Sequence, residues 1–586
     1  MCGIVSIIGK DATESSVTGA LSVLTHRGPD DHGTMVFPGA VLGQTRLAII
    51  DLSPSGHQPM MDNKKNVAIT FNGEIYNYKE LRTELEVLGH SFSTQSDTEV
   101  ILKAYAQYGV ECPKYLDGMF AFCIWDAEKS QLLMAKDRFG KKPLYYAHTP
   151  TGSLVVGSEI KALLASGVKG EIDPGAIDAY LSLMFVPPWR TIYKNVHTIL
   201  GGHSAVYKDG KLTVSKYWEL EYKPISISYD EARTEVKRLF NESVRKRMIA
   251  DVEIGSFLSG GVDSTLVTAY AQKFATHPIK TFSLGYGQEI NELPFAEEAS
   301  KKIGTDHHTL QANSELTGEL EKSLAYFDEP HGDTASFPQH ILSRETAKQV
   351  KVALSGEGGD ELFLGYGYFF SYFHTNKLSR LRNMLFSNQY KDFIRNSTVF
   401  PTALRKSLFK GNIEIAREPI DGLVASCKGT AMQKMDLYEI TTHMQGLLLT
   451  KVDRMSMMHG LEVRCPFLDY KLAEFVFNLP EEYKTDRNTG KIILKDILRE
   501  IMPDSFVDRK KQGFGAPVRK WLSEEKMRAY VEKKFSDDAE VYTYLKKEAV
   551  QSFVQGVYTK GHPKGYYQLW VLLCLEIWLE KHVSLH

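Results

Sequence analysis

The chain has 586 residues and a formal net charge of -2 at pH 7, with 43% hydrophobic and 24% charged residues. This length predicts several domains, because a domain usually holds about 100–200 residues. The balanced charge argues against nucleic acid as a partner. We expect neither a membrane span nor a secretory signal, because no segment has the required length and composition.

Cysteine usage points to the compartment. The chain has six cysteines, with no C-x-x-C pair and no clustering: Cys2, Cys112, Cys123, Cys427, Cys465 and Cys574. This pattern argues against a disulfide framework and against a zinc knuckle, and it fits a reducing environment. We therefore expect a cytoplasmic protein.

The first part of the chain, residues 1–210, reads as short strands separated by turns. Apolar, partly alternating segments predict mainly antiparallel strands at 40–52, 66–74, 118–126, 131–138 and 153–159. The segment 96–109 predicts a helix that starts with a capping box from Ser96 and Glu99 and ends at Gly109. This part is expected to be of the α+β type.

After a polar, turn-rich connection near residues 205–230, the pattern changes. Helical and strand-like segments alternate: a helix over 229–250, a strand over 253–259, a helix over 265–275, and strands over 279–286 and 350–356. Such alternation predicts a parallel sheet. Helical patterns dominate from about residue 365, and the short apolar run 569–579, which contains Glu576, predicts a buried helix. The fold class is therefore α/β, with a helical C-terminal part.

Cys2 stands one residue from the start of the chain. Removal of Met1 would leave a cysteine with a free α-amino group, whose ordinary pKa is about 8, beside a thiol of pKa about 8.5. Such an amine can act as general base for its own side chain, as it does for N-terminal threonine nucleophiles. The alternative is an early cysteine without a role.

Polar residues downstream suit a pocket for an amino-acid amide. The Asn72 side chain and the Gly73 N–H could donate to an oxyanion, although Asn-Gly is also a common hairpin turn. Arg46 could bind a carboxylate through two hydrogen bonds. Asp97 stands at a helix start, where an N-cap carboxylate is the simpler explanation.

A second candidate site is "FLSGGVDSTLV" at 257–267, where a strand runs into a helix. Glycines there allow close approach to an anion, and the N–H groups of a helix start bind phosphate. The pattern G-x-x-x-x-G-K-[ST] is absent, so this is not a Walker loop. Downstream, Asp360 and Glu361 lie in a glycine-rich turn and offer the hard oxygen ligands that suit Mg²⁺, unless the turn is only a solvated loop.

The motifs of the first part together resemble a known domain. "MCGIVSIIG", "HRGPDDHG", "TRLAIID", "FNGEIYNY" and "SDTEV" are similar to the glutaminase domain of class II glutamine amidotransferases. These are N-terminal nucleophile hydrolases with a four-layer αββα fold. The resemblance implies Cys2 as nucleophile after removal of Met1, with Asn72 and Gly73 stabilising the oxyanion. It implies that glutamine is bound by Arg46, Asn72, Glu74 and Asp97.

The second part resembles N-type ATP pyrophosphatases, which adenylate a substrate and release pyrophosphate. The resemblance implies a parallel-sheet domain and these ATP-binding residues: Leu258, Ser259, Gly260, Gly261, Val262, Asp263, Ser264, Leu284, Ser355 and Gly356. It implies Asp263 and Asp360 as Mg²⁺ ligands and Glu357 as general base at the ammonia step. "LLLTKVDRMSMMHGLEVRCPFLDY" is similar to the asparagine synthetase signature, in which either Lys451 or Arg454 would neutralise charge on the acyl-phosphate.

Both halves together resemble the glutamine-hydrolysing asparagine synthetase family over essentially the whole chain. The resemblance implies a glutaminase domain at 1–210 and a synthetase domain at 225–586. It implies ATP and Mg²⁺ as cofactors, glutamine and aspartate as substrates, no nucleic-acid or membrane partner, and a homodimer as one possible assembly. Relatives commonly read "DELFGGY" where this chain reads "DELFLGYGYF", so Leu364 replaces a small residue beside the expected acceptor pocket. The acceptor could therefore be another carboxylate, such as a uronic acid of a bacterial surface polysaccharide.

Two functions of other classes fit the sequence less well. A tRNA-modifying ATP pyrophosphatase should carry a basic face, and it would leave the amino-terminal motifs unexplained. A binding protein without catalysis should lack Cys2 or Asp263, and the chain has both.

Overall fold

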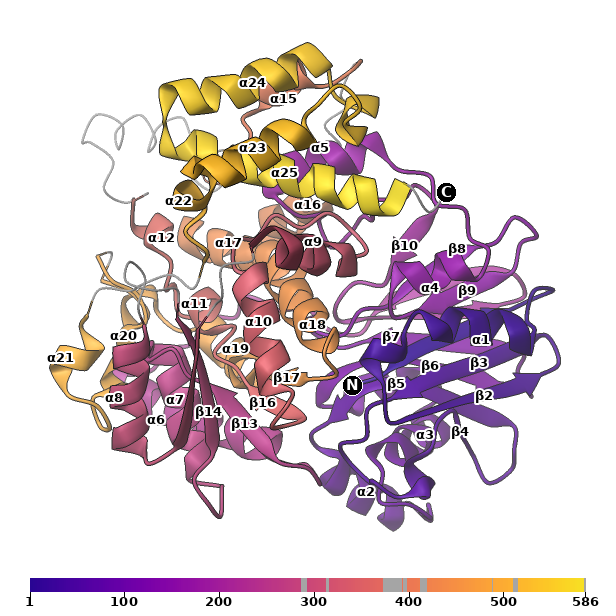
Figure 1. Cartoon of the computed structure of the whole chain (residues 1–586). Helices are drawn as coiled ribbons and strands as arrows, with labels where there is room; N and C mark the ends of the chain where they lie inside the picture. The colour runs from indigo at the N-terminus through magenta and orange to yellow at the C-terminus, as the bar shows by residue number, and fades with distance from the viewer. Residues whose placement is uncertain are drawn as a thin grey trace.

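The structure is a computed structural model. It describes residues 1–285, 292–311, 316–371, 393, 398–411, 419–486, 488–509 and 515–583. The chain forms a part built on two antiparallel sheets, a part built on a parallel sheet, and a group of helices that covers the parallel sheet (Figure 1).

Two six-stranded sheets make up the first part, and every ladder between their strands is antiparallel. The first sheet runs β10 (Val196–Thr198), β8 (Tyr145–His148), β9 (Leu154–Gly157), β1 (Gly3–Ile8), β3 (Ala40–Arg46), β2 (Asp31–Phe37). The second runs β12 (Lys211–Lys216), β11 (His203–Lys208), β7 (Gln131–Lys136), β6 (Gly118–Asp126), β5 (Val67–Ile75), β4 (Met60–Met61). The second sheet therefore continues past residue 210.

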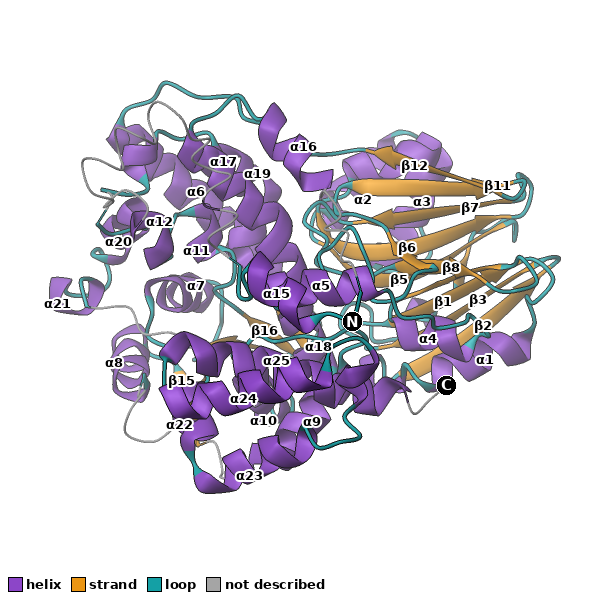
Figure 2. Cartoon of the chain, turned by 90° about the horizontal axis from the view of Figure 1, so that it is seen from above, coloured by secondary structure: helices purple, strands orange, loops and turns teal. Residues whose placement is uncertain are grey.

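The two sheets are stacked face to face and carry helices on their outer faces, as Figure 2 shows. Strand β1 has apolar side chains on both faces. Ile4 and Ile8 lie in the core between the sheets, whereas Val5 and Ile7 pack with α1 (Glu14–Ser22) on the outer face. Successive side chains of a strand point to opposite faces, so an apolar strand of this kind is covered on both. Helix α4 (Ile160–Ala165) also covers the first sheet, and α2 (Tyr78–Val87) and α3 (Asp97–Tyr108) cover the second. The predicted αββα arrangement is confirmed.

Helix α3 begins and ends as predicted, but its capping differs. Ser96 is the N-cap and accepts a hydrogen bond from the Thr98 N–H at 3.2 Å. The Glu99 carboxylate turns away from the predicted capping box and accepts the N–H groups of Ser93 and Thr94. The loop before the helix thus competes successfully for Glu99.

A five-stranded parallel sheet organises the second part. Its order is β15 (Asp306–Gln311), β14 (Lys280–Gly285), β13 (Ile254–Phe257), β16 (Val352–Leu354), β17 (Glu462–Arg464). The chain builds outward from β13 on one side first and then on the other. The strand order therefore reverses between β13 and β16, and in open parallel sheets ligands bind at the carboxyl ends of the strands at such a switch point.

Helices cover both faces of this sheet. One face packs against α6 (Tyr229–Arg247), α7 (Val262–Gln272), α8 (Leu293–Ile303), α19 (Tyr470–Phe477) and α20 (Ile492–Leu498). The other face packs against α10 (Ser336–Thr346), with α9 (Leu316–Tyr326) and α25 (Pro563–Val583) outside it. Helix α25 is the predicted buried helix. Its fully buried Glu576 accepts the N–H groups of Glu540 and Val541 at 3.0 and 2.8 Å.

The described ranges contain further α-helices and one π-helix. They are α5 (Pro174–Leu183), α11 (Gly359–Leu362), α12 (Gly367–Ser371), α15 (Thr402–Leu408), α16 (Pro419–Ser426), α17 (Ala431–Tyr438), the π-helix η4 (Glu439–Leu449), α18 (Thr450–Met457), α21 (Asp504–Val507), α22 (Val518–Ser523), α23 (Glu525–Lys534) and α24 (Lys547–Lys560). Within the described ranges, none of the helices has both the length and the apolar composition needed to cross a membrane.

The amino terminus lies between the two parts of the chain in both views (Figures 1 and 2). Met1 is buried, and its ammonium group is 3.5 Å from Oε2 of Glu462 on the edge strand β17. The start of the first sheet therefore meets the edge of the second part.

Candidate active sites

Cys2 immediately precedes β1 and is 5% exposed. Its backbone N–H donates to Oδ1 of Asn72 at 3.0 Å, and its carbonyl accepts from Nε of Arg27 at 3.0 Å. Burial raises the pKa of the Cys2 thiol, so the free thiol is a weak nucleophile until a base lies next to it. An α-amino group at position 2, produced by removal of Met1, would supply that base.

Asn72 and Gly73 lie inside β5, not in a hairpin turn. Among the described residues, Nδ2 of Asn72 is buried and has no hydrogen-bond acceptor. Gly73 has φ of 153°, and a Cβ at this position would overlap the Met119 carbonyl oxygen. An unused amide donor beside a residue that must be glycine fits a two-donor oxyanion hole, and it removes the hairpin as an explanation.

Arg46 is buried at the end of β3. Its Nη2 donates to the carbonyl oxygens of Ile50 and Asp51 at 3.2 and 2.6 Å. A Cβ at Gly56 would overlap that nitrogen, so the absence of a side chain there admits the guanidinium group. Backbone contacts thus orient Arg46, as a carboxylate-binding residue requires.

Two buried carboxyl groups lie close to this pocket. Asp97 is not the N-cap of α3, because its carboxylate accepts the Ile75 N–H at 2.9 Å and burial raises its pKa to about 6. Burial, followed by the charge of Glu462, raises the pKa of Glu74 well above its usual range. Two carboxyl groups held away from solvent would gain from a bound α-ammonium group.

Strand β17 joins this pocket to the second part. Arg464 donates from Nε to Glu462 at 2.7 Å, and its Nη2 is 3.6 Å from Glu74. The carbonyl of Arg464 accepts the N–H of Ser355 at 2.9 Å. One residue therefore contacts the predicted glutamine site through its side chain and the predicted nucleotide site through its backbone.

The segment Ser259–Ser264 leads from β13 into the first turn of α7 at the switch point of the sheet. Ser264 accepts the Ser259 N–H through its hydroxyl at 3.2 Å, and Ser259 accepts the Gly261 N–H at 3.2 Å. Gly260 has φ of 72°, and a Cβ there would come within 2.6 Å of the Phe295 backbone. The loop is thereby folded tightly at the start of α7, where N–H groups are available to an anion.

The second nucleotide motif meets this loop from β16. A Cβ at Gly356 would lie 3.0 Å from Cβ of Asp263, and one at Gly359 would overlap the Asp263 carboxylate. Glycines in the 355–360 segment therefore allow it to pack directly on Asp263. Leu258 and Leu284 are buried at the ends of the neighbouring strands β13 and β14.

Lys491 is a site residue that the sequence did not reveal. Its ammonium group binds the carboxylates of both Asp263 and Asp360, and its Nζ is 2.7 Å from Oδ1 of Asp360. Lys491 adopts a left-handed backbone conformation directly before α20, and its N–H donates to the Phe363 carbonyl at 2.9 Å. The one hint in the sequence is Gly365, because a Cβ there would overlap both the lysine side chain and Asp360.

The two candidate cations of the signature motif lie in different surroundings. Nζ of Lys451 is 3.1 Å from Asp333. Burial lowers the pKa of Lys451, but the charges of Asp333 and Glu357 outweigh burial and raise it. Glu357 itself hydrogen-bonds the Ser355 hydroxyl. Arg454 instead pairs with Glu159 at 2.8 Å and Asp328 at 3.0 Å. The geometry directs Lys451 to the nucleotide side and Arg454 to the boundary between the two parts.

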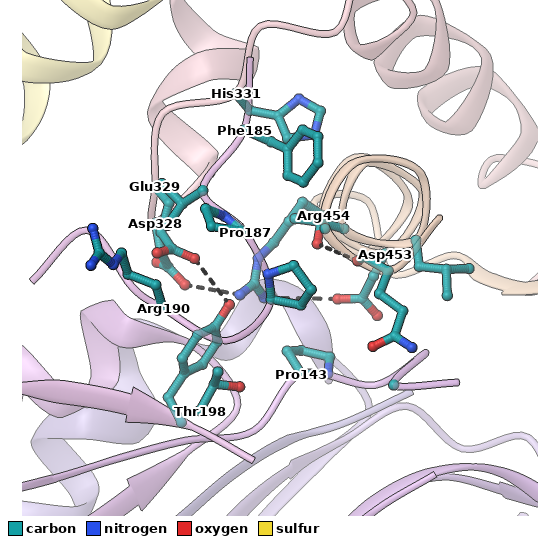
Figure 3. A pocket seen from close by; sticks show the side chains of 18 of the residues that line it. Pro143, Phe185, Pro187, Arg190, Thr198, Asp328, Glu329, His331, Asp453 and Arg454 are labelled. Atoms are coloured by element: carbon teal, nitrogen blue, oxygen red, sulfur yellow. Dashed lines mark hydrogen bonds and ion pairs between the residues drawn. The ribbon is translucent and has the colours of Figure 1, made fainter. Parts of the chain in front are cut away.

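Arg454 also lines a cavity of about 50 Å³ at that boundary. Figure 3 shows Asp328 and Glu329 on one side of Arg454 and Asp453 on the other, and Phe185 and Pro187 also line the cavity. None of the residues predicted to bind glutamine, ATP or metal lines this cavity. Leu364, which the sequence placed near the acceptor, has φ of 53° and is fully buried in a cluster with Phe369, Met435 and Tyr438.

Two stacked antiparallel sheets covered by helices, followed by a parallel sheet with a glycine-rich loop at its switch point, form the arrangement that the sequence predicted for a two-part, glutamine-dependent ATP ligase. The sequence models of two families match the chain, "Glutamine amidotransferase domain" over residues 1–218 and "Asparagine synthase" over residues 235–580. The chain belongs to the asparagine synthase family. It is an ATP-dependent enzyme that forms a carbon–nitrogen bond with nitrogen from glutamine.

Several curated proteins are similar to the chain over most of its length. "Asparagine synthetase [glutamine-hydrolyzing] 1" of Bacillus subtilis (strain 168) is 33% identical, over 99% of this chain and 96% of that protein. A "Putative asparagine synthetase [glutamine-hydrolyzing]" of Mycobacterium tuberculosis (strain ATCC 25618 / H37Rv) is 34% identical, over 89% of this chain and 88% of that protein. "Amidase chyE" of Penicillium rubens is 28% identical, over 93% and 91%.

Proposed function

We propose that the enzyme makes asparagine from aspartate, with ATP as the activating reagent and glutamine as the nitrogen donor. The relatives named asparagine synthetase support the product. The observation that carries the proposal is the position of β17, whose Arg464 contacts Glu74 on one side and Ser355 on the other. Two pockets that share one strand suit a reaction in which one pocket produces ammonia and the other consumes it.

The first half-reaction takes place at Cys2. The α-amine exposed by removal of Met1 takes the thiol proton, and the sulfur attacks the amide carbon of glutamine. Asn72 and Gly73 donate hydrogen bonds to the oxyanion, which lowers the barrier. The α-ammonium group returns its proton to the amide nitrogen as the C–N bond breaks, so ammonia leaves, and water then hydrolyses the glutamyl thioester to glutamate and restores the thiol. Arg46 binds the α-carboxylate, while Glu74 and Asp97 bind the α-ammonium group.

The second half-reaction takes place at the carboxyl ends of β13 and β16. We assign the phosphates of ATP to Ser259, Gly260, Gly261, Val262 and Ser264 with Ser355 and Gly356, and the surroundings of adenine to Leu258 and Leu284. The aspartate side-chain carboxylate attacks the α-phosphorus, pyrophosphate leaves, and an acyl-adenylate remains. Ammonia then attacks the acyl carbon, Glu357 takes a proton, and AMP leaves. Lys451 offsets the negative charge that develops on the acyl-phosphate.

The residues at this site fit Mg²⁺. The carboxylates of Asp263 and Asp360 are hard oxygen donors that one cation, Lys491, already brings together. When bound there, Mg²⁺ would neutralise phosphate charge. The chain's own residues fold the loop around the phosphates and hold the two carboxylates in one place.

One incubation tests this function. The purified enzyme is given glutamine, MgATP and one carboxylate at a time, including aspartate, glutamate and a uronic acid, and pyrophosphate and the amide product are measured. Pyrophosphate and asparagine with aspartate alone is the expected result. An amide product with a uronic acid alone would indicate an amidotransferase of surface polysaccharides. If no carboxylate led to pyrophosphate release, the proposal would be contradicted.

A further inference from the structure

The cavity of about 50 Å³ at the boundary between the two parts is separate from both proposed catalytic pockets, because none of the residues assigned to glutamine, ATP or metal lines it. Strand β7 and the loop after it contribute one wall, and the π-helix η4 contributes another. A buried water needs about 10–15 Å³ of such space, so the cavity suits a ligand of about four or five non-hydrogen atoms.

Lys136, the last residue of β7, lines this cavity with an uncommitted ammonium group. Among the described residues, that group has neither an ion pair nor a hydrogen bond. Lys141 of the same wall, in contrast, donates to the Leu468 carbonyl at 3.1 Å. Burial lowers the pKa of Lys136 to about 8, and the charges of Asp137 and Asp453 do not offset it. The cavity is therefore lined by a cation that gains from a bound negative charge.

Gln445 of η4 brings a second unused group to the same space. Its side-chain amide forms no hydrogen bond within the described ranges. A Cβ at Gly140 would lie 3.2 Å from Cε of Lys136 and 3.6 Å from Oε1 of Gln445. Gly140 has φ of 68°, which favours glycine, and its missing side chain keeps the space beside the ammonium and amide groups open.

The acidic residues of the cavity do not compensate the lysine. Asp328 and Asp453 both pair with Arg454, at 3.0 and 3.7 Å. Glu329 is mostly protonated near neutral pH, because burial and then the charge of Asp328 raise its pKa to about 8. A cationic ligand would thus find no unpaired carboxylate here, whereas an anion would find Lys136.

We propose that the cavity binds a small carboxylate-type anion, with two oxygens on one carbon, between the ammonium group of Lys136 and the side-chain amide of Gln445. One oxygen accepts from the ammonium group and the other from the amide NH₂, so the two unused donors are satisfied together. Acetate and bicarbonate share this chemistry and this size. Lys136 belongs to the first part and Gln445 to the second, so the bound anion links the parts and stabilises their boundary.

Isothermal titration calorimetry of the full-length enzyme, without its substrates, tests this site with sodium acetate and with sodium bicarbonate. Sodium chloride at equal ionic strength is the reference, because chloride has the charge but not the paired oxygens. Lys136→Met and Gln445→Leu each remove one donor. Lys208→Met is the matched control, since Lys208 is exposed at the end of β11, the strand that pairs with β7. Thermal melting in chloride checks that each variant is folded.

The wild type should bind acetate or bicarbonate more tightly than chloride, and that anion should raise its melting temperature. Lys136→Met and Gln445→Leu should each weaken the binding by about tenfold or more, because a hydrogen bond to a charged group is lost. Lys208→Met should bind as the wild type does. The preferred anion identifies a free carboxylate or bicarbonate as the ligand.

Two results overturn the inference. One is a wild type that binds neither acetate nor bicarbonate more tightly than chloride. The other is wild-type affinity in Lys136→Met or, if that variant does not fold, in Gln445→Leu. Neither result touches the proposed function, because the cavity shares no residue with the catalytic pockets.

Discussion

Arg27 and Asp453 form a doubly hydrogen-bonded ion pair across the boundary between the two parts of the chain, with N–O distances of 2.8 and 3.1 Å. Both side chains are almost completely buried, and Arg27 also donates to the Cys2 carbonyl and to Glu159. The backbone of Cys2, the proposed nucleophile, is therefore held by an arginine that an aspartate of the other half binds.

Breaking this pair should be costly. Asp453→Asn leaves the Arg27 charge without its main partner, and removal of one member of a buried pair typically costs about 3–5 kcal/mol. Chemical denaturation should show a loss of that size. Glu345→Gln removes a partner of Lys348 and Arg344 near the surface and should cost less than about 1 kcal/mol. Equal losses in both variants would contradict the importance of the buried pair.

The role of Cys2 separates the two half-reactions. Cys2→Ala should abolish glutamine-dependent amide formation while ammonium salts still support it, because the ATP site is unchanged. Liquid chromatography of amino acids measures both reactions. Cys427→Ala, which changes a partly buried free thiol elsewhere, should keep both. Retention of Met1 in the mass spectrum of a glutamine-active enzyme would contradict the assigned base.

Lys451 and Arg454 should fail in different ways. Lys451→Met removes the cation that lies close to Glu357 and should lower ammonia-dependent pyrophosphate release by about 10²-fold or more. Arg454→Met removes one buried cation from Glu159 and from Asp328, which keep Lys161, and should mainly lower the melting temperature. If Arg454→Met lost pyrophosphate release at an unchanged melting temperature, Arg454 would be the catalytic cation.

The boundary cavity predicts a pH effect through Glu329. Burial, and then the charge of Asp328, raises the pKa of Glu329 to about 8 from its ordinary 4.5. Between these values the folded state keeps a proton that the unfolded state has lost. The contribution of Glu329 to stability therefore falls as pH rises from about 4.5 to about 8, by up to about 1.4 kcal/mol per pH unit, and is constant above that range.

Glu329→Gln should flatten this dependence, because glutamine can still accept the Ile192 N–H that Glu329 accepts at 2.8 Å. The measurement is the free energy of unfolding of both proteins between pH 5 and 9. Parallel curves for the two proteins would mean that Glu329 ionises in the folded state as it does in water.

Local patterns in the sequence predicted most of the elements that carry the sites. The segment 118–126 matches β6 residue for residue, and the glycine-rich stretch 257–267 runs from the end of β13 into α7, as expected of a strand that leads into a helix. These features depend on near neighbours, such as strand alternation and the turn that glycine allows. The prediction of a parallel sheet likewise followed from alternation of strands and helices.

Contacts between distant residues were beyond such patterns. Lys491 is 228 positions from Asp263, and Arg27 is 426 positions from Asp453. Neither contact produces a periodic pattern in the sequence, because each joins two single side chains that come together only when the whole chain has folded. Glu99 shows the same limit at short range: the sequence allowed two sets of N–H partners, and the loop conformation selected one.

The arrangement around Glu159 restricts how this enzyme can be recombined with its relatives. Glu159 of the first part binds Arg27 of its own part and Arg454 of the other, while Asp453 and Asp328 complete the charges from the far side. A chimera that joins a foreign glutaminase half to this synthetase half would keep only the synthetase members of these buried ion pairs. Such a chimera should fold only when the acidic and basic residues of this boundary are all taken from the same protein.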